Sequence, residues 1–507
     1  MGKANVTKPI QKTTRGGLLP SSSWPSRRML ILISAALATM TLAIYWRATS
    51  FDFVDLDDFE YVLQNPHVRD GLTLNSIEWA FNIGYAANWH PLTWLSHMLD
   101  GQLYGMTPGQ LHGTGGHHLT SILFHVANSV LLFLFFVRLT HSLWPSALVA
   151  ALFAIHPLHV ESVVWVSERK DVLSTFFMIL TLWAYLWYRE RRNVQKYILV
   201  ALLFAAALMA KQMVVTLPFL LLLLDFWPAC LVSSPKKFWQ LFAEKLPLLA
   251  LSLAAGLIAI KAQASDNALA PTGSVSMVAR ITTAVVAYVA YLGNTFWPRN
   301  LACYYADTGV HWNFGQIGGG ALLLVGTTYF AIRLARRHPY FFVGWIWYLV
   351  TLLPVIGLLQ IGGQARADRY TYVPLIGLFV IIAFAASELL SKCSKTVSRT
   401  IAAVLALVIV GALSLQAYAQ VGYWQTNETL WNHTLAVTKD NWFAHQAMAT
   451  ILNNQADALR TSGQATAADK KKSGSDSTSS NHTQSQTDPG ECSHRPGQCA
   501  DGGRKTG

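Results

Sequence analysis

Residues 29–46, MLILISAALATMTLAIYW, decide the fold class, because they form an apolar run that contains no charged side chain. A helix of about 20 such residues crosses the hydrocarbon core of a bilayer. Further apolar stretches of similar character follow along the chain. The predicted spans are 29–46, 117–137, 143–157, 171–188, 196–213, 214–229, 246–263, 317–334, 340–359, 372–390 and 400–418. We therefore predict an all-α protein, a polytopic transmembrane helical bundle with about eleven spans.

Composition supports this prediction. Hydrophobic residues make up 52% of the 507 residues and charged residues only 13%, whereas a soluble domain carries about 25% charged residues. The mean hydropathy is +0.33. The formal net charge is +12, but the basic residues lie in short clusters between apolar runs, as in the cytoplasmic loops of membrane proteins. We therefore predict a membrane partner and no nucleic-acid partner.

The positions of lysine and arginine predict the orientation of the bundle, since cytoplasmic loops carry an excess of both. Arg27 and Arg28 precede the first span, which places the N-terminus in the cytoplasm. With eleven spans the later clusters also fall inside. These clusters are Arg189, Arg191, Arg192, Lys236, Lys237, Arg333, Arg336, Arg337, Lys392, Lys395 and Arg399. The long loop 47–116 and the C-terminal part from about 419 then lie outside the cytoplasm.

The segment 278–297 has two readings. It is apolar enough to cross the membrane. If it did, the basic clusters at 333–337 and 392–399 would lie outside, against the charge bias. We therefore predict that 278–297 is an extracytoplasmic helix in the membrane interface, with Trp297 as an anchor.

Two adjacent carboxylates follow the first span. Asp57 and Asp58 lie among the aromatic residues Phe53, Phe59 and Tyr61. A carboxylate in such a half-apolar place has a tunable pKa, which suits a general base. The alternative is an ordinary solvated start of a loop.

Histidines mark two further extracytoplasmic segments. His90 precedes the stretch 91–104, which reads as an amphipathic surface helix. The segment 156–162 holds His156, His159 and Glu161, and ionisable groups so close to hydrocarbon are costly enough to indicate function. The spacing His-x-x-His-x-Glu is compatible with zinc. However, a proline follows His156 and no third ligand is apparent, so we predict no metal site.

Basic residues on the extracytoplasmic side run against the charge bias. Arg169 and Lys170 follow the histidine segment, and Arg366 and Arg369 precede the tenth span. Arginine and lysine at a membrane face suit a phosphate headgroup. The alternative is that they pair only with the acidic residues beside them.

No glycine-rich nucleotide loop and no nucleophile-elbow motif occurs in the sequence. The acids, histidines and basic residues gather outside the cytoplasm, where nucleotide sugars are absent. A lipid-linked donor fits that location, and no cofactor is predicted.

Taken together and in order, these motifs resemble a known family. They resemble the bacterial membrane proteins with C-terminal tetratricopeptide repeats (TPR), which are similar to the animal transmembrane-and-TPR O-mannosyltransferases and, more distantly, to protein O-mannosyltransferases of the GT-C fold. The likeness covers about 50–445. The segments that carry it are Asp57-Asp58, Asn88-Trp89-His90-Pro91, 156–162 (HPLHVES), 167–171 (SERKD), 280–298 and Ala367-Asp368-Arg369-Tyr370.

The resemblance implies an inverting glycosyltransferase of GT-C type. Such an enzyme moves a mannose-like sugar from a polyprenyl-phosphate carrier, which is a substrate, to a Ser/Thr hydroxyl of a protein. It implies that Asp57 or Asp58 is the base. The same resemblance gives Arg169, Lys170, Arg366 and Arg369 to the donor phosphate. The substrate pocket then contains His90, His156, His159 and Glu161.

The resemblance also implies a place and a domain organisation. The place is the inner membrane of a bacterium, with the N-terminus inside and the C-terminus outside. The predicted parts are a cytoplasmic tail (1–28), a transmembrane transferase domain (29–418), degenerate TPR-like helices (419–460) and a disordered tail (461–507). Because the repeat part is short, a glycolipid or cell-wall acceptor is an alternative. A lipid-carrier transporter or a scaffold without transferase activity is another.

Overall fold

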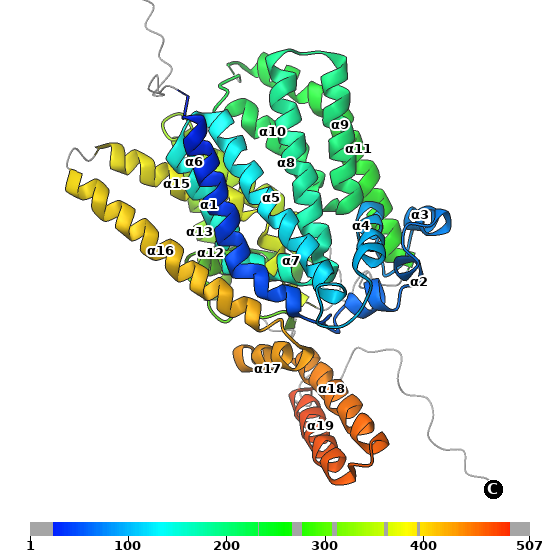
Figure 1. Ribbon diagram of the computed structural model, residues 1–507. Helices are drawn as coiled ribbons and strands as arrows, with labels where there is room; N and C mark the ends of the chain where they lie inside the picture. Colours follow the sequence, from blue (N-terminus) through cyan, green and yellow to red (C-terminus); the bar gives the residue numbers. More distant parts are fainter. Residues whose placement is uncertain are drawn as a thin grey trace, which may run out of the picture.

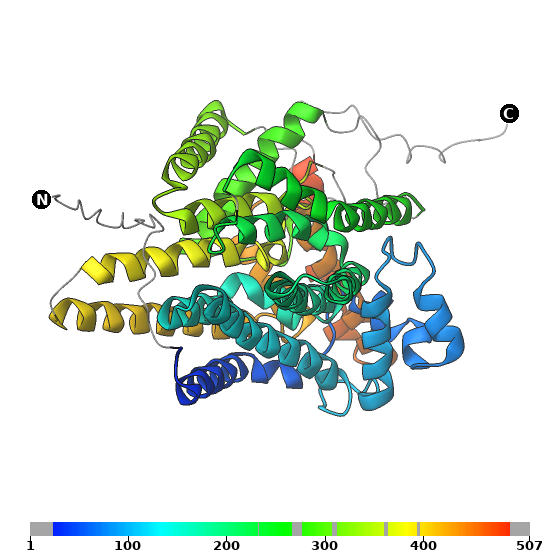
Figure 2. The same ribbon diagram turned by 90° about the horizontal axis from the view of Figure 1, so that it is seen from above.

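Long apolar helices run side by side between two ends of the molecule (Figures 1 and 2). The computed structural model describes residues 24–231, 233–265, 276–306, 312–358, 364–392 and 396–486. The helices of the bundle are α1 (Arg27–Tyr45), α5 (Thr114–Thr140), α6 (Leu143–Ile155), α8 (Arg169–Glu190), α9 (Val194–Ala210), α10 (Leu217–Phe226), α11 (Pro235–Ser265), α13 (Phe314–Leu334), α14 (Pro339–Leu352), α15 (Leu375–Lys392) and α16 (Thr396–Gly422). Each predicted span coincides with one of them.

The protein is an all-α polytopic membrane protein. Within the described ranges, eight helices are long and apolar enough to cross a membrane, and a ninth does so if α6 and the short helices after it form one bent span. Three shorter apolar helices, α9, α14 and the pair η5 (Gln212–Thr216) with α10, accompany them. The predicted fold class is therefore confirmed.

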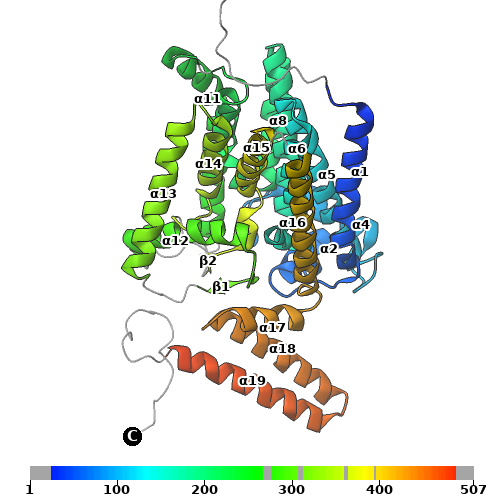
Figure 3. The same ribbon diagram turned by 90° about the vertical axis from the view of Figure 1, so that its left-hand side faces the viewer.

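One end of the bundle carries most of the irregular structure, and we call it the site end. The short elements there are η1 (Trp46–Ser50), η2 (Phe59–Leu63), α2 (Pro66–Arg69), α3 (Leu74–Ala80), α4 (Pro91–Tyr104), η3 (Pro157–His159), α7 (Val160–Val164), η4 (Val166–Glu168), β1 (Tyr305–Ala306), β2 (Gln364–Arg366) and η6 (Asp368–Thr371). Figure 3 shows α17 (Asn427–Val437) and the helices after it just beyond this end, whereas α1 begins at the opposite end.

The irregular structure of the site end has one local cause in the break at the end of α6. His156 leaves the helical conformation with ψ at 129°, and Pro157 starts the next short helix because its ring cannot continue α6. The chain bends by 54° there. The segment 156–162 follows this bend, and from it His156 contacts the Thr295 carbonyl and Glu161 pairs with Arg369.

Helix α12 (Met277–Phe296) passes the length test for a span, yet its contacts place it across the site end. The Arg280 guanidinium, near its start, donates to the Leu358 carbonyl at 3.4 Å, and the Thr295 carbonyl, near its end, accepts from His156 at 3.0 Å. Both partners belong to the site end, and Figure 3 shows α12 beneath the long helices. The geometry therefore favours the predicted interface helix over a crossing.

The C-terminal part differs from the sequence prediction. Helix α18 (Trp442–Thr461) is followed by α19 (Ala465–Gln486), so residues 465–486 are helical and the predicted start of disorder at 461 is wrong. The Ser475 hydroxyl donates to the Ala449 carbonyl at 3.1 Å, which ties α19 to α18. Contact with α18 overrides the weak helix preference of the serine-rich sequence. The rest of the predicted tail, 487–507, and most of the N-terminal tail lie outside the described residues.

Helices α14 and α15 touch through glycines. A Cβ atom built on Gly377 would meet the Gly344 carbonyl oxygen at 2.3 Å, and one built on Gly344 would meet the Gly377 carbonyl oxygen at 2.3 Å. Small residues allow backbones to approach in membrane bundles. Gly411 on α16 has nothing within 4 Å of its Cβ position and offers a matched control.

We expect Gly377→Leu to prevent folding, because the leucine side chain would overlap the backbone of α14 at Gly344. Fluorescence-detected size exclusion should show loss of the monodisperse peak for Gly377→Leu and a normal peak for Gly411→Leu. A normal peak for both variants would contradict the close packing of α14 and α15.

Candidate active site

A cluster of ion pairs lies at the site end with Glu168 at its centre. The Glu168 carboxylate contacts three cations: Lys170 at 3.2 Å, Lys211 at 2.9 Å and the Arg369 Nε at 3.2 Å. The side chains of the cations are 9%, 14% and 10% exposed, so each is largely desolvated but still reachable. Charge pairs in such places interact far more strongly than pairs in water.

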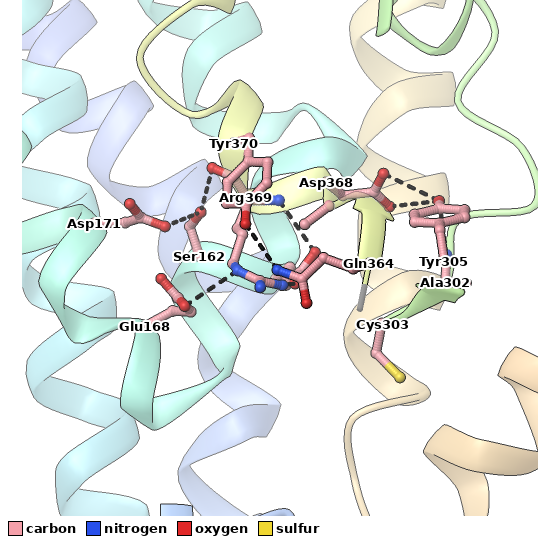
Figure 4. Close-up of polar contacts among 12 residues, drawn as sticks. Ser162, Glu168, Asp171, Ala302, Cys303, Tyr305, Gln364, Asp368, Arg369 and Tyr370 are labelled. Atoms are coloured by element: carbon pink, nitrogen blue, oxygen red, sulfur yellow. Dashed lines mark hydrogen bonds and ion pairs between the residues drawn. The ribbon is translucent and has the colours of Figure 1, made fainter. Parts of the chain in front are cut away.

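A second layer of acids completes the cluster. Arg369 also donates through Nη1 to Glu161 at 2.5 Å, and the Arg369 backbone N–H donates to the same carboxylate at 3.1 Å. The Lys211 ammonium contacts Asp171 at 2.7 Å, and Asp171 accepts from the Ser162 hydroxyl at 3.0 Å. Figure 4 shows Glu168 joined to the Arg369 guanidinium, and Ser162 joined to Asp171 beside them. Segments about 200 residues apart in sequence thus meet here.

Some donors of this cluster remain available. Arg369 uses Nη1 and Nε on carboxylates, and its Nη2 has no such partner within the described ranges. Lys170 has one ion pair there although its ammonium carries three N–H donors. An additional anion can therefore be held without breaking the existing pairs.

Asp57 and Asp58 play different structural parts. Asp58 is fully buried and accepts from the Val54 backbone at 3.1 Å, the Ser167 backbone at 2.8 Å and the Ser167 hydroxyl at 2.5 Å. Burial nevertheless raises the pKa of Asp58 to about 7. These bonds pin the first loop onto η4, two residues from Lys170. The Asp58 carboxylate therefore holds the loop in place.

Asp57 is the carboxylate of this pair that is influenced by the charges of the cluster. Its side chain is partly exposed, and it accepts no hydrogen bond from the described residues. Burial raises the pKa of Asp57, while Lys170 and Arg369 lower it and Glu168 raises it. Asp57 is thus an unoccupied acceptor beside basic residues that have donors to spare.

We expect Asp58→Ala to lower the free energy of unfolding by about 3 kcal/mol, since it leaves two buried backbone and side-chain donors on Ser167 and one on Val54 unsatisfied. Thermal unfolding of the purified protein in detergent measures this loss, with Asp52→Ala as the control at an exposed position of the same loop. Equal melting temperatures for the two variants would refute the role of Asp58.

Aromatic rings form the walls around the basic residues. The Lys170 ammonium lies 4.8 Å from the Tyr61 ring centre, and the Arg369 guanidinium lies 5.1 Å from the Trp165 ring centre. Trp165 stacks on Trp424, the rings 6.0 Å apart, at the junction with the C-terminal helices. Cation–π contacts of this kind help to orient the basic groups.

The three predicted histidines are all buried, but they lie at different places. His90 packs between Tyr61 and Trp94 beside Lys170, and burial lowers its pKa well below the usual range. The Nε2 of His156 bonds to the Thr295 carbonyl of α12 at 3.0 Å, and the Nδ1 of His159 bonds to the Phe153 carbonyl at 2.8 Å. Of the three, only His90 lies against residues that also contact the basic cluster.

Arg169 is separated from the cluster although it adjoins Lys170 in sequence. It is fully buried and pairs with Asp100 of α4 at 2.7 Å. It also donates to Ser121, Ser96 and the His117 carbonyl. These contacts join α4, α5 and α8, so Arg169 holds the walls of the site together rather than facing its interior.

Arg366 lies at the edge of the site on β2. Its guanidinium lies 4.2 Å from the ring centre of Tyr305, its partner in the β1–β2 pair. The Tyr305 hydroxyl contacts both oxygens of Asp368 at 3.0 Å, and burial and Glu161 raise the pKa of Asp368 to about 8. Figure 4 shows Tyr305 and Asp368 on the side of Arg369 away from Glu168.

Sequence reasoning missed two central residues. Lys211 was absent from the predicted site, although a lone charge between two apolar runs is a signal of function. Glu168 was treated only as a neighbour of Arg169 and Lys170, and it is the hub of the cluster. Within the described ranges, no group of three or more histidine, cysteine, aspartate or glutamate side chains could hold a metal ion.

The chemistry that this arrangement can perform is specific. A reachable carboxylate can accept a proton, and two neighbouring cations can hold an anionic oxygen.

No protein-family model matches the chain. Over 444 residues it is 23% identical to a protein O-mannosyl-transferase of Caenorhabditis elegans, an alignment that covers 84% of this chain and 60% of that protein. The chain is similar to animal protein O-mannosyl-transferases.

Two further protein O-mannosyl-transferases match shorter parts. The chain is 30% identical over 192 residues to Tmtc1 of Drosophila melanogaster, which is 36% of this chain and 21% of that protein. It is 28% identical over 156 residues to TMTC3 of Mus musculus, which is 29% of this chain and 16% of that protein. The chain thus spans at most 60% of the length of these relatives. The names agree with the resemblance predicted from the motifs, while bacterial origin and the GT-C fold stay predictions.

Proposed function

We propose that this protein is an inverting glycosyltransferase of GT-C type that moves a mannose-like sugar from a polyprenyl-phosphate carrier to a Ser/Thr hydroxyl of a protein. The observation that carries the proposal is Asp57, a partly exposed carboxylate that accepts no hydrogen bond from the described residues and whose pKa the charges of Lys170 and Arg369 lower. The names of the similar proteins support O-mannosyl transfer to protein.

The reaction is a single displacement. The acceptor hydroxyl gives its proton to a carboxylate oxygen of Asp57, and the hydroxyl oxygen attacks the anomeric carbon of the donor. The bond from that carbon to the phosphate oxygen breaks, and the electron pair leaves with the polyprenyl phosphate. Attack from the face opposite the leaving group inverts the anomeric centre.

The basic cluster stabilises the leaving phosphate. Lys170 and the Nη2 of Arg369 offer free donors to it, and Glu168 holds both cations in place together with Lys211. Fixed cations in a desolvated place stabilise developing negative charge without reorganisation. Arg169 and Arg366 are positioning residues in this scheme, one for helix α4 and one for Tyr305.

The basic residues at the other end of the bundle support a proposal for the location of the site. Helices α8 and α13 leave the site end and finish in Arg189 and Arg333, and α11 starts with Lys236 and Lys237. By the positive-inside rule that end is cytoplasmic. We place the protein in the inner membrane of a bacterium, with its N-terminus inside and its site on the extracytoplasmic face.

The proposal predicts the direction of the pH dependence. Asp57 must be ionised to accept a proton, and burial raises its pKa above the ordinary value of about 3.9. The value of kcat/KM is therefore expected to fall as the pH drops through this raised pKa. Lys170→Met removes a charge that lowers the pKa of Asp57, so the acidic limb should move to higher pH. A limb that stays in place or moves to lower pH would contradict the effect of the Lys170 charge on Asp57.

The experiment that tests the function uses proteoliposomes with radiolabelled polyprenyl-phosphate mannose and a mixture of secreted proteins and membrane glycolipids. Label that appears in protein and is released by β-elimination supports the proposal. Label in glycolipid alone would favour the alternative acceptor class. Movement of the carrier across the bilayer without sugar transfer would favour a transporter.

A further inference from the structure

Helix α12 contributes no side chain to the proposed reaction, yet it contacts the segment that carries Arg369. Tyr291 of α12 is 1% exposed. Its hydroxyl donates to the Ala367 carbonyl at 3.0 Å and accepts from the Ala367 backbone N–H at 3.0 Å. Ala367 is itself 2% exposed, and a buried backbone group without a partner is costly. One hydroxyl of α12 thus serves both backbone polar groups of the residue two positions before Arg369.

Ala367 is the N-cap of η6, the short helix that contains Arg369. The Ala367 carbonyl also accepts from the Tyr370 backbone N–H at 3.2 Å, which closes the first turn of η6. Residues with a side-chain oxygen are strongly preferred at an N-cap, whereas Ala367 makes no side-chain cap bond. The Tyr291 hydroxyl therefore supplies an anchor for this turn that the alanine cannot supply.

A second buried tyrosine hydroxyl holds the next residue of η6. The Tyr305 hydroxyl of β1 contacts both carboxylate oxygens of Asp368 at 3.0 Å (Figure 4). Tyr291 and Tyr305 belong to different elements, α12 and β1, and they hold two successive positions of the chain. The backbone on which Arg369 sits is thus fixed from two sides.

The position of this backbone matters because most of the Arg369 guanidinium is already used. Its Nη1 contacts Glu161 and its Nε contacts Glu168, whereas Nη2 has no such partner within the described ranges. The guanidinium is planar and its donors form a rigid fork. The backbone position and the two ion pairs together therefore determine where Nη2 points.

We propose that Tyr291 is a positioning residue for Arg369, since its hydroxyl fixes the start of η6 and thereby the place at which the free Nη2 meets the donor phosphate. The inference rests on the proposed function, and it extends the site to α12. The hydroxyl bonds to backbone and acts on the phosphate only through Arg369. Its loss should therefore matter little where Arg369 is absent.

The first test removes the hydroxyl and keeps the ring. Tyr291→Phe is compared with Tyr288→Phe on the same helix, where the Tyr288 hydroxyl donates to the Leu349 carbonyl of α14 at 2.7 Å. A slight misplacement of a catalytic group costs up to about 10²-fold in rate. We expect kcat for transfer from polyprenyl-phosphate mannose to fall about 10–10²-fold in Tyr291→Phe, with little change in KM for the donor. Tyr288→Phe should keep the wild-type kcat.

A double-mutant cycle separates positioning from a general loss of stability. Effects of independent sites multiply in the rate, whereas effects that pass through one shared residue do not. In the Arg369→Gln background, Tyr291→Phe should therefore lower kcat by no more than about twofold. The full loss in that background would overturn the positioning role. Tyr305→Phe enters the same cycle if Tyr291→Phe does not fold, because its hydroxyl holds Asp368 of η6.

Binding of polyprenyl phosphate without a sugar separates this inference from the proposed function. The free phosphate carries the charge that develops as the sugar departs, so its Kd, measured by native mass spectrometry in detergent, reports on the same contact. Tyr291→Phe and Arg369→Gln should each raise Kd about tenfold, as for loss of one hydrogen bond to a charged group, and the double variant no further.

The outcomes of the two tests differ. That binding pattern without any sugar transfer by the wild type would keep the positioning role and refute the function. Sugar transfer by the wild type, with unchanged kcat and Kd in Tyr291→Phe, would keep the function and refute the positioning role. A wild type that neither transfers the sugar nor binds polyprenyl phosphate would refute both.

Discussion

Replacing Asp57 by asparagine is expected to lower the rate of sugar transfer by about 10²–10⁴-fold, the usual contribution of a general base. Asparagine has the same shape but cannot accept the proton of the acceptor hydroxyl. The fold should be unaffected, because the Asp57 side chain accepts no hydrogen bond within the described part of the chain. Initial rates at saturating donor and acceptor measure the effect, and KM for the donor should change little.

The first loop provides the controls for this prediction. Asp52→Asn changes an exposed carboxylate five residues away, and it should keep wild-type activity. Asp58→Asn should lower the melting temperature and lower activity through the loop it holds. If Asp57→Asn kept its rate while Asp58→Asn lost activity at equal stability, the base would be Asp58 and the assignment would be wrong.

Replacing Arg369 by glutamine is expected to have the second large effect. It removes the cation that joins Glu161, Glu168 and the proposed leaving phosphate. We expect kcat to fall by about 10²–10³-fold, as for loss of other groups that stabilise an anionic transition state. Because buried carboxylates lose their partner, the free energy of unfolding should also fall by about 3–5 kcal/mol.

The two effects of Arg369→Gln can be separated. Adding Glu161→Gln removes one of the unpaired charges, so the double variant should regain stability but not activity. Arg299→Gln, at an exposed arginine of the site end that lies over Trp297, should alter neither quantity. Recovery of activity together with stability in the double variant would show that Arg369 acts only on the fold.

The sequence predicted the bundle well because each span must hide its backbone from lipid, and apolar runs reveal this need directly. For the ambiguous segment 278–297 the charge pattern predicted an interface helix, since a crossing would place basic clusters on the wrong side, and the contacts of α12 at the site end favour the same reading. The tail was harder to predict, because α19 is polar and serine-rich and its contact with α18 is not visible in the local sequence.

The sequence predicted some members of the site, but neither all of them nor their roles. The motifs gave Asp57, Lys170, Arg369 and Glu161, which the structure brings together. They could not show that Arg169, one position before Lys170, faces the core and pairs with Asp100. Adjacent residues on a helix point about 100° apart, and only packing decides which of them faces the site. The ion pairs of Lys211 depend on the fold in the same way.

The central claim is that this bundle moves a sugar from a polyprenyl phosphate to a protein hydroxyl. The most direct measurement incubates the purified wild-type protein in liposomes with polyprenyl-phosphate mannose of known anomeric configuration and a threonine peptide, and then determines the product by mass spectrometry and NMR. The account predicts a peptide with one mannose on the threonine oxygen, in the anomeric configuration opposite to that of the donor. A mannosyl peptide with the donor's configuration, or an unmodified peptide with the donor intact, would contradict it.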